Sequence, residues 1–523
     1  MKKDQIMNKR NLRQSAFFNL SVSIGLVVFL GGVFLAPLGF SAFSETSAAA
    51  PLSGPDPLIA KVTQIRGAEG TGSCGGGYGL GVGLVDLDHG LAAGSTTYDH
   101  GGFLWCETYA PYLWSEQDGT STLFELQGDF NWRRSTYIPS GMTPDGSKVV
   151  GGVIFFDRGT NAPWTWTGNG GPVEFLKLPE GYSGGNAVAV SNDGRLIAGN
   201  SRGPSRVGVS RAAVWRDGSP EILPSTQPWS AVGGNPFEVN VAYTARRTHP
   251  MTDDGSVIVG AAGAAFLVGC KATKWVNGLE QQLSTGGVEA QSSIAVFAAN
   301  SGVIFGYAVL SDGRVVLVRW DADGNPEIFE PPNGLSVVNL SSVDSQGNAA
   351  GGALAQQFRC IQQCEDPLCK RKPFVWTRRG GFTILPENGL EDTYNTSAVL
   401  DVSDDGRVAV GQLSTCEVRP DNPPQQAFTW SAASGLVLVD DLMAAYGQPD
   451  PHYYLATDVS RNGNRVLVVG NPPLTDARDT ADLTLDLAWP TPIPKPRRTP
   501  PPYLSRSHVI GSVTPGVPSE SLR

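Results

Sequence analysis

The sequence predicts an all-β fold built from eight copies of one repeat, because three features recur in the same order along the chain. The first is a turn of the form Ser-x-Asp-Gly, clearest at Ser191-Asn-Asp-Gly194 and Ser403-Asp-Asp-Gly406. The second is a run of small or β-branched residues that closes on a glycine, which is Gly199 or Gly411 in these two copies. The third is an apolar stretch that ends on a tryptophan. A large aromatic residue at a fixed point of a repeat indicates a packing role.

Six further copies align with these two. The turn glycines of copies one to eight are Gly90, Gly146, Gly194, Gly255, Gly302, Gly347, Gly406 and Gly463. The closing tryptophans are Trp114, Trp166, Trp215, Trp275, Trp320, Trp376, Trp430 and Trp489. Eight of the 12 tryptophans therefore have one structural role.

Each copy predicts four short strands. An Asp-Gly turn between alternating apolar residues indicates a tight hairpin, in which glycine takes the positive φ that other residues resist. β-branched residues such as Val257-Ile-Val259 form the second strand, and the tryptophan segment forms the third. A fourth follows, for example at Val173-Glu-Phe-Leu-Lys-Leu178.

The repeat length selects the architecture. Successive strand-closing glycines are separated by 45 residues (Gly306 to Gly351) at the shortest and 61 residues (Gly199 to Gly260) at the longest. Such a unit suits the four-stranded blade of a β-propeller and is too long for one coil of a β-helix.

The eighth copy lacks a fourth strand, because Pro490-Thr-Pro-Ile-Pro-Lys-Pro follows Trp489 directly. Residues 58–65, Leu-Ile-Ala-Lys-Val-Thr-Gln-Ile, form a lone strand pattern near the other end of the chain. A propeller must cover the open edge between its first and last blades. We therefore expect this N-terminal strand to complete the last of eight blades, with seven blades as the alternative if the divergent first copy is not a blade.

The segment Leu178 to Gly199, together with Ala427-Phe-Thr-Trp430, resembles the HAF-type extracellular repeat of bacterial exported proteins. The resemblance spans residues 85–489. It implies an exported, β-rich repeat protein, and it carries over no catalytic residue because the motif consists of turn and core positions.

The N-terminal region predicts export. Five basic residues precede an uncharged, apolar stretch at residues 14–44, which indicates a signal peptide or an uncleaved signal anchor within residues 1–50. The propeller is expected at residues 57–489, followed by a Pro-rich spacer at residues 490–523. We expect an extracellular, cell-surface or periplasmic monomer that contacts the membrane only if the N-terminal segment is retained.

The formal net charge of -10 argues against binding to nucleic acid or to an anionic membrane by charge alone. The cysteines show none of the paired spacings that are usual for zinc, and in an exported chain they indicate disulfides. The Asp pairs at 253/254 and 404/405, with Asp86 and Asp88, are candidate calcium ligands, but Asp in a hairpin turn usually caps its own backbone. We therefore expect no metal or cofactor, with calcium as the open alternative. The predicted disulfide residues are Cys74, Cys106, Cys360, Cys364, Cys369 and Cys416. Cys74 is expected to bridge Cys106, the pairing of the other four stays open, and Cys270 is expected to take no part.

Catalytic patterns are weak. Gly181-Tyr-Ser-Gly-Gly185 matches a nucleophile elbow, but a strand follows it instead of the required helix. No two of the five histidines have a metal-ligand spacing. Carboxylates are abundant, so a secreted glycosidase or lyase with an acid pair at the channel mouth remains the alternative function.

Aromatic and arginine side chains outside the repeat positions are the better candidates, because such residues are favoured binding anchors. The predicted binding residues are His100, Trp105, Trp132, Arg133, Arg134, Tyr137, Trp229, Arg246, Arg247 and His249. The structural alternative is that they pack the channel or its rim. The sequence thus predicts a non-enzymatic module that binds a protein or glycan through its loop-rich face.

Overall fold

The computed structural model consists of residues 1–50 and residues 51–523 as two units, and the structure describes part of the second unit. The described residues are 57–65, 82–98, 108–126, 135–155, 160–168, 171–203, 210–233, 249–263, 269–356, 370–386, 390, 394–415, 425–447, 452–471 and 481–488. Their regular secondary structure is almost entirely β-strand, as predicted, with one α-helix, α1 (Val439–Ala445), in the described part. No helix there is long and apolar enough to cross a membrane.

The strands form seven sheets in the described part. The first in chain order has nine strands: β2 (Val82–Asp86), β3 (Leu91–Tyr98), β4 (Thr108–Ser115), β5 (Thr120–Leu123), β6 (Glu125–Leu126), β7 (Ser135–Met142), β8 (Lys148–Phe155), β9 (Thr160–Thr167) and β10 (Pro172–Phe175). Two four-stranded sheets follow: β11 (Gly184–Val190), β12 (Leu196–Arg202), β13 (Ser210–Arg216) and β14 (Ser219–Ile222), then β15 (Trp229–Val232), β16 (Val257–Gly263), β17 (Lys271–Val276) and β18 (Leu279–Gln282).

Three more four-stranded sheets repeat this order. They are β19 (Ala290–Ala298), β20 (Ile304–Leu310), β21 (Val315–Trp320) and β22 (Pro326–Phe329); β23 (Ser336–Val343), β24 (Ala349–Ala355), β25 (Lys372–Thr377) and β26 (Gly381–Ile384); and β27 (Ala398–Val402), β28 (Val408–Ser414), β29 (Gln425–Ser431) and β30 (Gly435–Leu438). A short 3₁₀ helix, η2 (Pro332–Gly334), lies between β22 and β23. The last sheet combines β31 (His452–Val459), β32 (Arg465–Asn471) and β33 (Ala481–Ala488) with β1 (Leu58–Ile65).

The Ser-x-Asp-Gly segment closes a hydrogen-bonded loop between the first and second strands of a copy. Ser191 Oγ donates to Asp193 Oδ1 (2.6 Å) and accepts from the Leu196 N–H (3.0 Å), while Asp193 Oδ1 also accepts from the Arg195 N–H (3.0 Å). Gly194 has φ +70°. The same hydroxyl and +2 side-chain contacts occur in the turns that begin at Thr143, Thr252, Ser403 and Ser460. The motif residues therefore define the hairpin directly.

Neighbouring turns also contact one another through the second turn residue. The Asn192 N–H donates to the Asp253 carbonyl (2.7 Å), and the Asp404 N–H donates to the Arg461 carbonyl (3.0 Å). The Arg461 N–H donates to the carboxylate of Asp88, in the first copy (3.4 Å). These contacts connect successive sheets at the end where the turns between first and second strands lie.

The strand-closing glycine is required by a β-bulge in the first strand. In copy three, Ala187 pairs with Gly199 and Ala189 pairs with Ala198, so Val188 is the extra residue. A Cβ on Gly199 would lie 2.1 Å from the carbonyl oxygen of Asn186, which no side chain tolerates. The equivalent distances at Gly151, Gly260, Gly306, Gly352 and Gly411 are 2.1, 1.9, 1.9, 2.0 and 2.1 Å. In copy six this glycine is Gly352 and not the expected Gly351.

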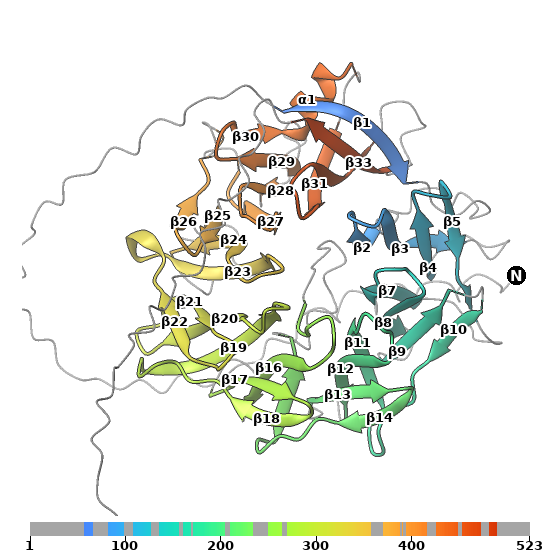
Figure 1. Cartoon of the computed structure of the whole chain (residues 1–523), viewed down its shortest axis with the longest axis vertical. Helices are drawn as coiled ribbons and strands as arrows, with labels where there is room; N and C mark the ends of the chain where they lie inside the picture. Colours follow the sequence, from blue (N-terminus) through green and yellow to red (C-terminus); the bar gives the residue numbers. More distant parts are fainter. Residues whose placement is uncertain are drawn as a thin grey trace, which may run out of the picture. The chain divides into compact units, whose positions relative to one another are not determined.

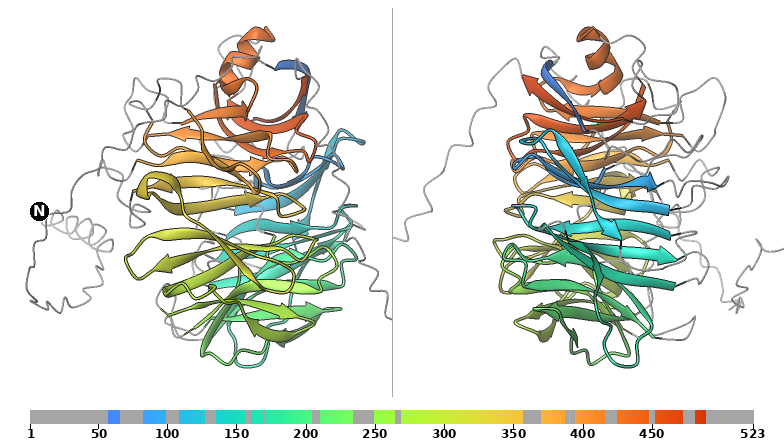
Figure 2. Two further views of the ribbon diagram at one scale, coloured as in Figure 1. Left: turned by 60° about the vertical axis from the view of Figure 1, so that its left-hand side comes forward. Right: turned by 90° about the vertical axis from the view of Figure 1, so that its right-hand side faces the viewer.

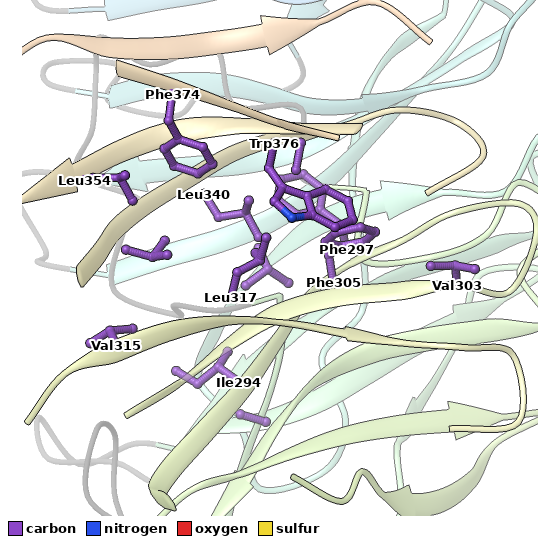
Figure 3. Packing of buried hydrophobic residues seen from close by; sticks show 14 of the residues in the cluster. Ile294, Phe297, Val303, Phe305, Val315, Leu317, Leu340, Leu354, Phe374 and Trp376 are labelled. Atoms are coloured by element: carbon purple, nitrogen blue, oxygen red, sulfur yellow. The ribbon is translucent and has the colours of Figure 1, made fainter. Parts of the chain in front are cut away.

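The closing tryptophans join each copy to the preceding one. Trp215 Nε1 donates to the Lys177 carbonyl (2.7 Å), and Trp275 Nε1 donates to the Pro224 carbonyl (2.8 Å). Both carbonyls belong to the connection that follows the previous copy's fourth strand. Trp376 packs edge-on against Phe305 of the preceding sheet (Figure 3), and their ring centroids are 5.4 Å apart. An indole supplies the buried area at this position, and in copies three, four and five its N–H also donates to the preceding copy.

The N-terminal strand pairs within the last sheet. β1 runs antiparallel to β33, from Leu58 opposite Ala488 to Ile65 opposite Asp482, and Figure 1 shows β1 in blue beside β33 in red. Trp489 lies just outside the described residues.

The last sheet also contacts the first copy. The apolar residues of this contact are Ile65, Leu87, Ala92, Tyr112, Trp114 and Leu467. Arg465 on β32 binds Glu116 at the end of β4 (2.6 Å), and Lys61 on β1 binds the same carboxylate (2.9 Å). Sheets that follow one another in the chain lie side by side, as Figures 1 and 2 show.

Candidate functional site

Three of the predicted binding residues lie in the described part of the chain: Tyr137, Trp229 and His249. The others lie outside it, namely His100, Trp105, Trp132, Arg133, Arg134, Arg246 and Arg247. All six predicted disulfide cysteines also lie outside it, whereas Cys270 is fully buried at the start of the third strand of copy four.

Tyr137 and Trp229 are core residues, which corrects their assignment to exposed connections. Tyr137 is 1% exposed and its ring lies 6.1 Å from that of Trp164, and burial raises the pKa of its hydroxyl. Trp229 is 7% exposed and packs in a cluster with Cys270 and Ile294. For these two residues the packing alternative is the one that burial supports. His249 is exposed.

Residues 233–249 interrupt the first strand of copy four and do not connect two blades, as we had expected for Trp229 and the residues up to His249. Val232 pairs with Gly260, and Met251 pairs with Ile258. Between them, Val259 accepts from the Gly233 N–H (3.1 Å) and donates to the Pro250 carbonyl (2.7 Å). In copy three the same place holds only the bulge residue Val188. A long segment therefore replaces a bulge at the edge strand of this sheet.

The antiparallel order separates two ends of each sheet. Hairpins between first and second strands, and between third and fourth strands, lie at one end, which we call the hairpin end. Connections between second and third strands, and from one copy to the next, lie at the other, which we call the connection end. Connecting segments carry binding residues more often than turns fixed by a repeat do.

At the connection end, α1 joins copies seven and eight. Val439, Leu442 and Met443 are its buried residues, at the i, i+3, i+4 spacing of one helix face, and they pack with the core of copies seven and eight. Tyr446 ends the helix with 45% of its surface exposed, and Gly447 follows with φ +95°. The helix thereby fixes the position of Asp440 in its first turn.

Asp440 contacts the start of β31. Its Oδ1 accepts from the Tyr453 N–H (2.7 Å), and its Oδ2 lies 3.9 Å from His452 Nδ1. The His452 side chain is 38% exposed and that of Asp440 is 17% exposed. The nearby carboxylate of Asp440 raises the pKa of His452 above its usual value, although partial burial opposes this. The imidazole of His452 is therefore accessible to solvent, and Asp440 favours its protonated form.

Two tyrosines lie near the same carboxylate. Burial raises the pKa of Tyr394, which is 3% exposed, and the charge of Asp440 adds to this effect. Burial and the charge of Asp440 also raise the pKa of Tyr453 to about 12. Perturbed ionisable groups that gather at one place mark candidate functional sites. We call these residues, His452, Asp440 and Tyr394, together with the exposed Tyr446 at the other end of the helix, the α1 site.

The hairpin end has a different electrostatic character. A side-chain hydrogen bond from Thr143 lowers the pKa of Asp145, one from Ser191 lowers that of Asp193, and a backbone hydrogen bond from Ser256 lowers that of Asp254. These carboxylates therefore already accept hydrogen bonds within their own turns. No group of three or more His, Cys, Asp or Glu in the part of the chain that the structure describes is arranged to hold a metal ion.

The repeat pattern of the sequence does not mark the α1 site. His452 is one of five histidines without a metal-ligand spacing, and Asp440 belongs to none of the predicted motifs. A signal was present, since Val439-Asp-Asp-Leu-Met-Ala-Ala-Tyr-Gly447 has apolar residues at helical spacing and ends on glycine, between a fourth strand and the next first strand.

No protein-family model matches the chain, and no characterised protein matches it in sequence. Among solved structures it is similar to the putative TolB from Agrobacterium tumefaciens, with 13% identity over 47% of this chain and 78% of that one and a TM-score of 0.32. The β-propeller domain of the Trilobed protease from Pyrococcus furiosus has 10% identity over 72% of this chain and 94% of its own, with a TM-score of 0.39. A prolyl endopeptidase has 10% identity over 74% of this chain and a TM-score of 0.45, and the match spans about half of its length (54%).

Proposed function

We propose that residues 57–489 form a closed eight-bladed β-propeller of the HAF repeat type. β2 to β5 pair in antiparallel order, and so do β7 to β10, which makes the nine-stranded sheet two blades. Two parallel residue pairs at the start of β4, Thr108 with Ser135 and Tyr109 with Thr136, join them. The contact of Arg465 with Glu116 and the pairing of β1 with β33 support closure between the last blade and the first.

The same proposal holds that the propeller is exported by its N-terminal segment and acts by binding a protein or glycan at the connection end. The observation that supports this binding role is that the polar side chains at the two ends of the sheets have different partners. Turn carboxylates at the hairpin end are held by their own hydroxyls and amides, whereas the α1 site offers a half-exposed His452 beside Asp440 and an exposed Tyr446 ring. Histidine, carboxylate and tyrosine supply donors, acceptors and an apolar face, which suits recognition of a polar ligand.

Glycan-array binding by the secreted protein tests the proposal. His452→Ala and Tyr446→Ala should lower retention of the bound glycan at least tenfold, while thermal unfolding changes little because both side chains are partly exposed. Trp132→Ala tests, in the same assay, the site that the sequence predicts in the connection between copies one and two. Leu279→Ala, an exposed change in another blade, is the matched control and should bind as the unchanged protein does.

The alternative function, hydrolysis or lyase cleavage by an acid pair, predicts a different outcome. Incubation of each retained glycan with the protein should release no product if the module only binds. Product release that is lost on replacement of a single Asp or Glu would replace the binding proposal with the enzymatic one.

A further inference from the structure

Copy six departs from the repeat in the turn between β23 and β24. Asp344 stands where five of the other turns have Ser or Thr, and Gln346 stands where the same five have Asp or Asn. Asp344 is 3% exposed. Its Oδ1 accepts from the N–H groups of Asn348 (2.5 Å) and Ala349 (3.1 Å), which is the role that a hydroxyl has in the other turns.

The second oxygen of the Asp344 carboxyl group accepts no hydrogen bond. Asp344 Oδ2 is buried without a hydrogen-bond partner, whereas the hydroxyl of Ser191 satisfies both of its functions within the turn. Burial of an uncompensated carboxylate is costly, so the neutral form is favoured. Burial raises the pKa of Asp344 to about 7, and the nearby charge of Asp404 adds to the rise, although the Ala349 and Asn348 amides oppose it.

The turn meets the next sheet at Asp404. The Ser345 N–H donates to Asp404 Oδ1 (3.1 Å), so the residue that follows Asp344 contacts the carboxylate whose charge acts on Asp344. This contact crosses from the sheet of β23 to the sheet of β27. Two carboxyl groups therefore share one inter-sheet contact.

The other charged groups around this turn form hydrogen bonds or ion pairs with groups other than the Asp344 carboxyl. Asp401 on β27 accepts from Ser342 Oγ (2.5 Å) and from the Val459 N–H (2.8 Å). Arg319 on β21 donates to the carbonyl of Gly347 in the turn (3.1 Å) and to Glu327 (3.1 Å). The remaining carboxylate of the facing turn, Asp405, accepts from Ser403 Oγ (3.0 Å) and lies 3.5 Å from Arg407.

We propose that Asp344 is a proton-sensitive lock between the sheet of β23–β26 and the sheet of β27–β30. With a neutral carboxyl, the turn docks on Asp404 through Ser345. Ionisation places two carboxylates at the same contact, and their repulsion weakens it. The lock is independent of ligand binding at the α1 site, so failure of either proposal leaves the other standing.

The direction of the pH effect follows from the two states. An unfolded Asp carboxyl has a pKa of 3.8, and the folded one is at about 7, so unfolding releases a proton between these values. Stability therefore falls as the pH rises from the unfolded to the folded pKa, and it levels off above the folded one.

Denaturant unfolding between pH 4.5 and 8.5 tests the lock in two variants. Asp344→Asn keeps the Oδ1 acceptor and cannot ionise, and D344S/Q346D restores the repeat's own sequence if the first variant folds poorly. Relative to each variant, the unfolding constant of the unchanged protein should rise by up to about tenfold per pH unit and then become constant above the folded pKa. Asp193→Asn, in the matching turn of copy three, should leave the profile unchanged. Parallel profiles for the protein and both Asp344 variants would overturn the proposal.

Hydrogen exchange of the unchanged protein tests the docking step without a mutation. After correction for the intrinsic pH dependence of exchange, the Ser345 amide should lose protection above pH 7, whereas the Leu196 amide in the matching turn of copy three should not. Equal protection of both turns across the range would show that ionisation does not open this contact.

Discussion

Arg465 and Glu116 lie 349 residues apart in the sequence, and their charged atoms are 2.6 Å apart. Arg465 also holds Asp486 on the neighbouring strand (2.6 Å), and Lys61 reaches Glu116 from the N-terminal strand. Partial burial would raise the pKa of Glu116, but the hydrogen bonds and charges of Lys61 and Arg465 outweigh burial and lower it. Three chain segments that are far apart in sequence thus meet at one carboxylate.

Glu116→Gln should lower the free energy of unfolding by about 1 kcal/mol at neutral pH, since the group is partly exposed. Because the folded pKa lies below the usual value of 4.5, the contribution of Glu116 is present above that value and is lost as the pH falls through the folded pKa. Denaturant unfolding of the two proteins should therefore converge in acid. Asp118→Asn, in the same turn, is the control, and coincident curves at neutral pH would contradict the role of Glu116.

A secreted chain that begins at Gly67 should unfold at a lower temperature and associate in a concentration-dependent way, because removal of β1 leaves the edge of β33 uncovered. Differential scanning calorimetry and light scattering measure the two effects. A peptide of residues 58–65 added in trans should restore part of the lost stability. Unchanged melting after truncation would remove β1 from the closure of the fold.

Trp215→Ala should cost about 3 to 5 kcal/mol as a core truncation. Trp215→Phe should cost less, yet it should still lose about 1 kcal/mol because the Lys177 carbonyl loses its donor. Trp229 is buried like Trp215, so Trp229→Ala is also a core truncation. It should destabilise the fold and should not act selectively on ligand binding. Chemical denaturation of the three variants separates these outcomes.

Gly199→Ala should cost about 1 to 3 kcal/mol or prevent folding, because the new methyl group would lie 2.1 Å from the Asn186 carbonyl. Gly171→Ala is the matched control, since nothing lies within 4 Å of a Cβ there. Equal melting temperatures for both variants would mean that the bulge shifts without cost.

His452 should stabilise the fold at acidic pH. Its folded pKa is raised above the usual 6.5 by Asp440, so the contribution is fully present below 6.5 and is lost as the pH rises through the folded value. Asp440→Asn keeps the acceptor for the Tyr453 N–H and removes the charge. The difference in melting temperature between pH 5.5 and pH 8.5 should therefore be smaller in this variant than in the unchanged protein. An equal difference in both proteins would argue against stabilisation by the pair of His452 and Asp440.

Local chemistry explains which parts of the fold could be predicted from the sequence. The Ser-x-Asp-Gly hairpins were predictable because each motif residue makes a contact within the turn, as Ser191 and Asp193 do. The pairing of β1 with β33 followed from the proline run that starts at Pro490, which cannot continue a sheet.

The candidate site was harder to predict because it lies where the repeat is interrupted. The alignment of copies fixes turns and tryptophans, and it leaves the connections unassigned. Trp229-Ser-Ala-Val232 is a first strand whose second half resumes at Met251, so residues that seemed to belong to a connection are core. The α1 site depends on a carboxylate and a histidine that are brought together by a helix and the next strand, Asp440 and His452, which no spacing rule joins.

The pairing of Leu58 with Ala488 has a consequence for the order of the chain. In copy three, the third and fourth strands are joined by the turn at Asp217-Gly218, and in copy eight the corresponding strands belong to the two ends of the domain. A two-residue turn from Ala488 to Leu58 would supply the missing hairpin. The domain is therefore suited to circular permutation, with new ends placed in any connection between blades.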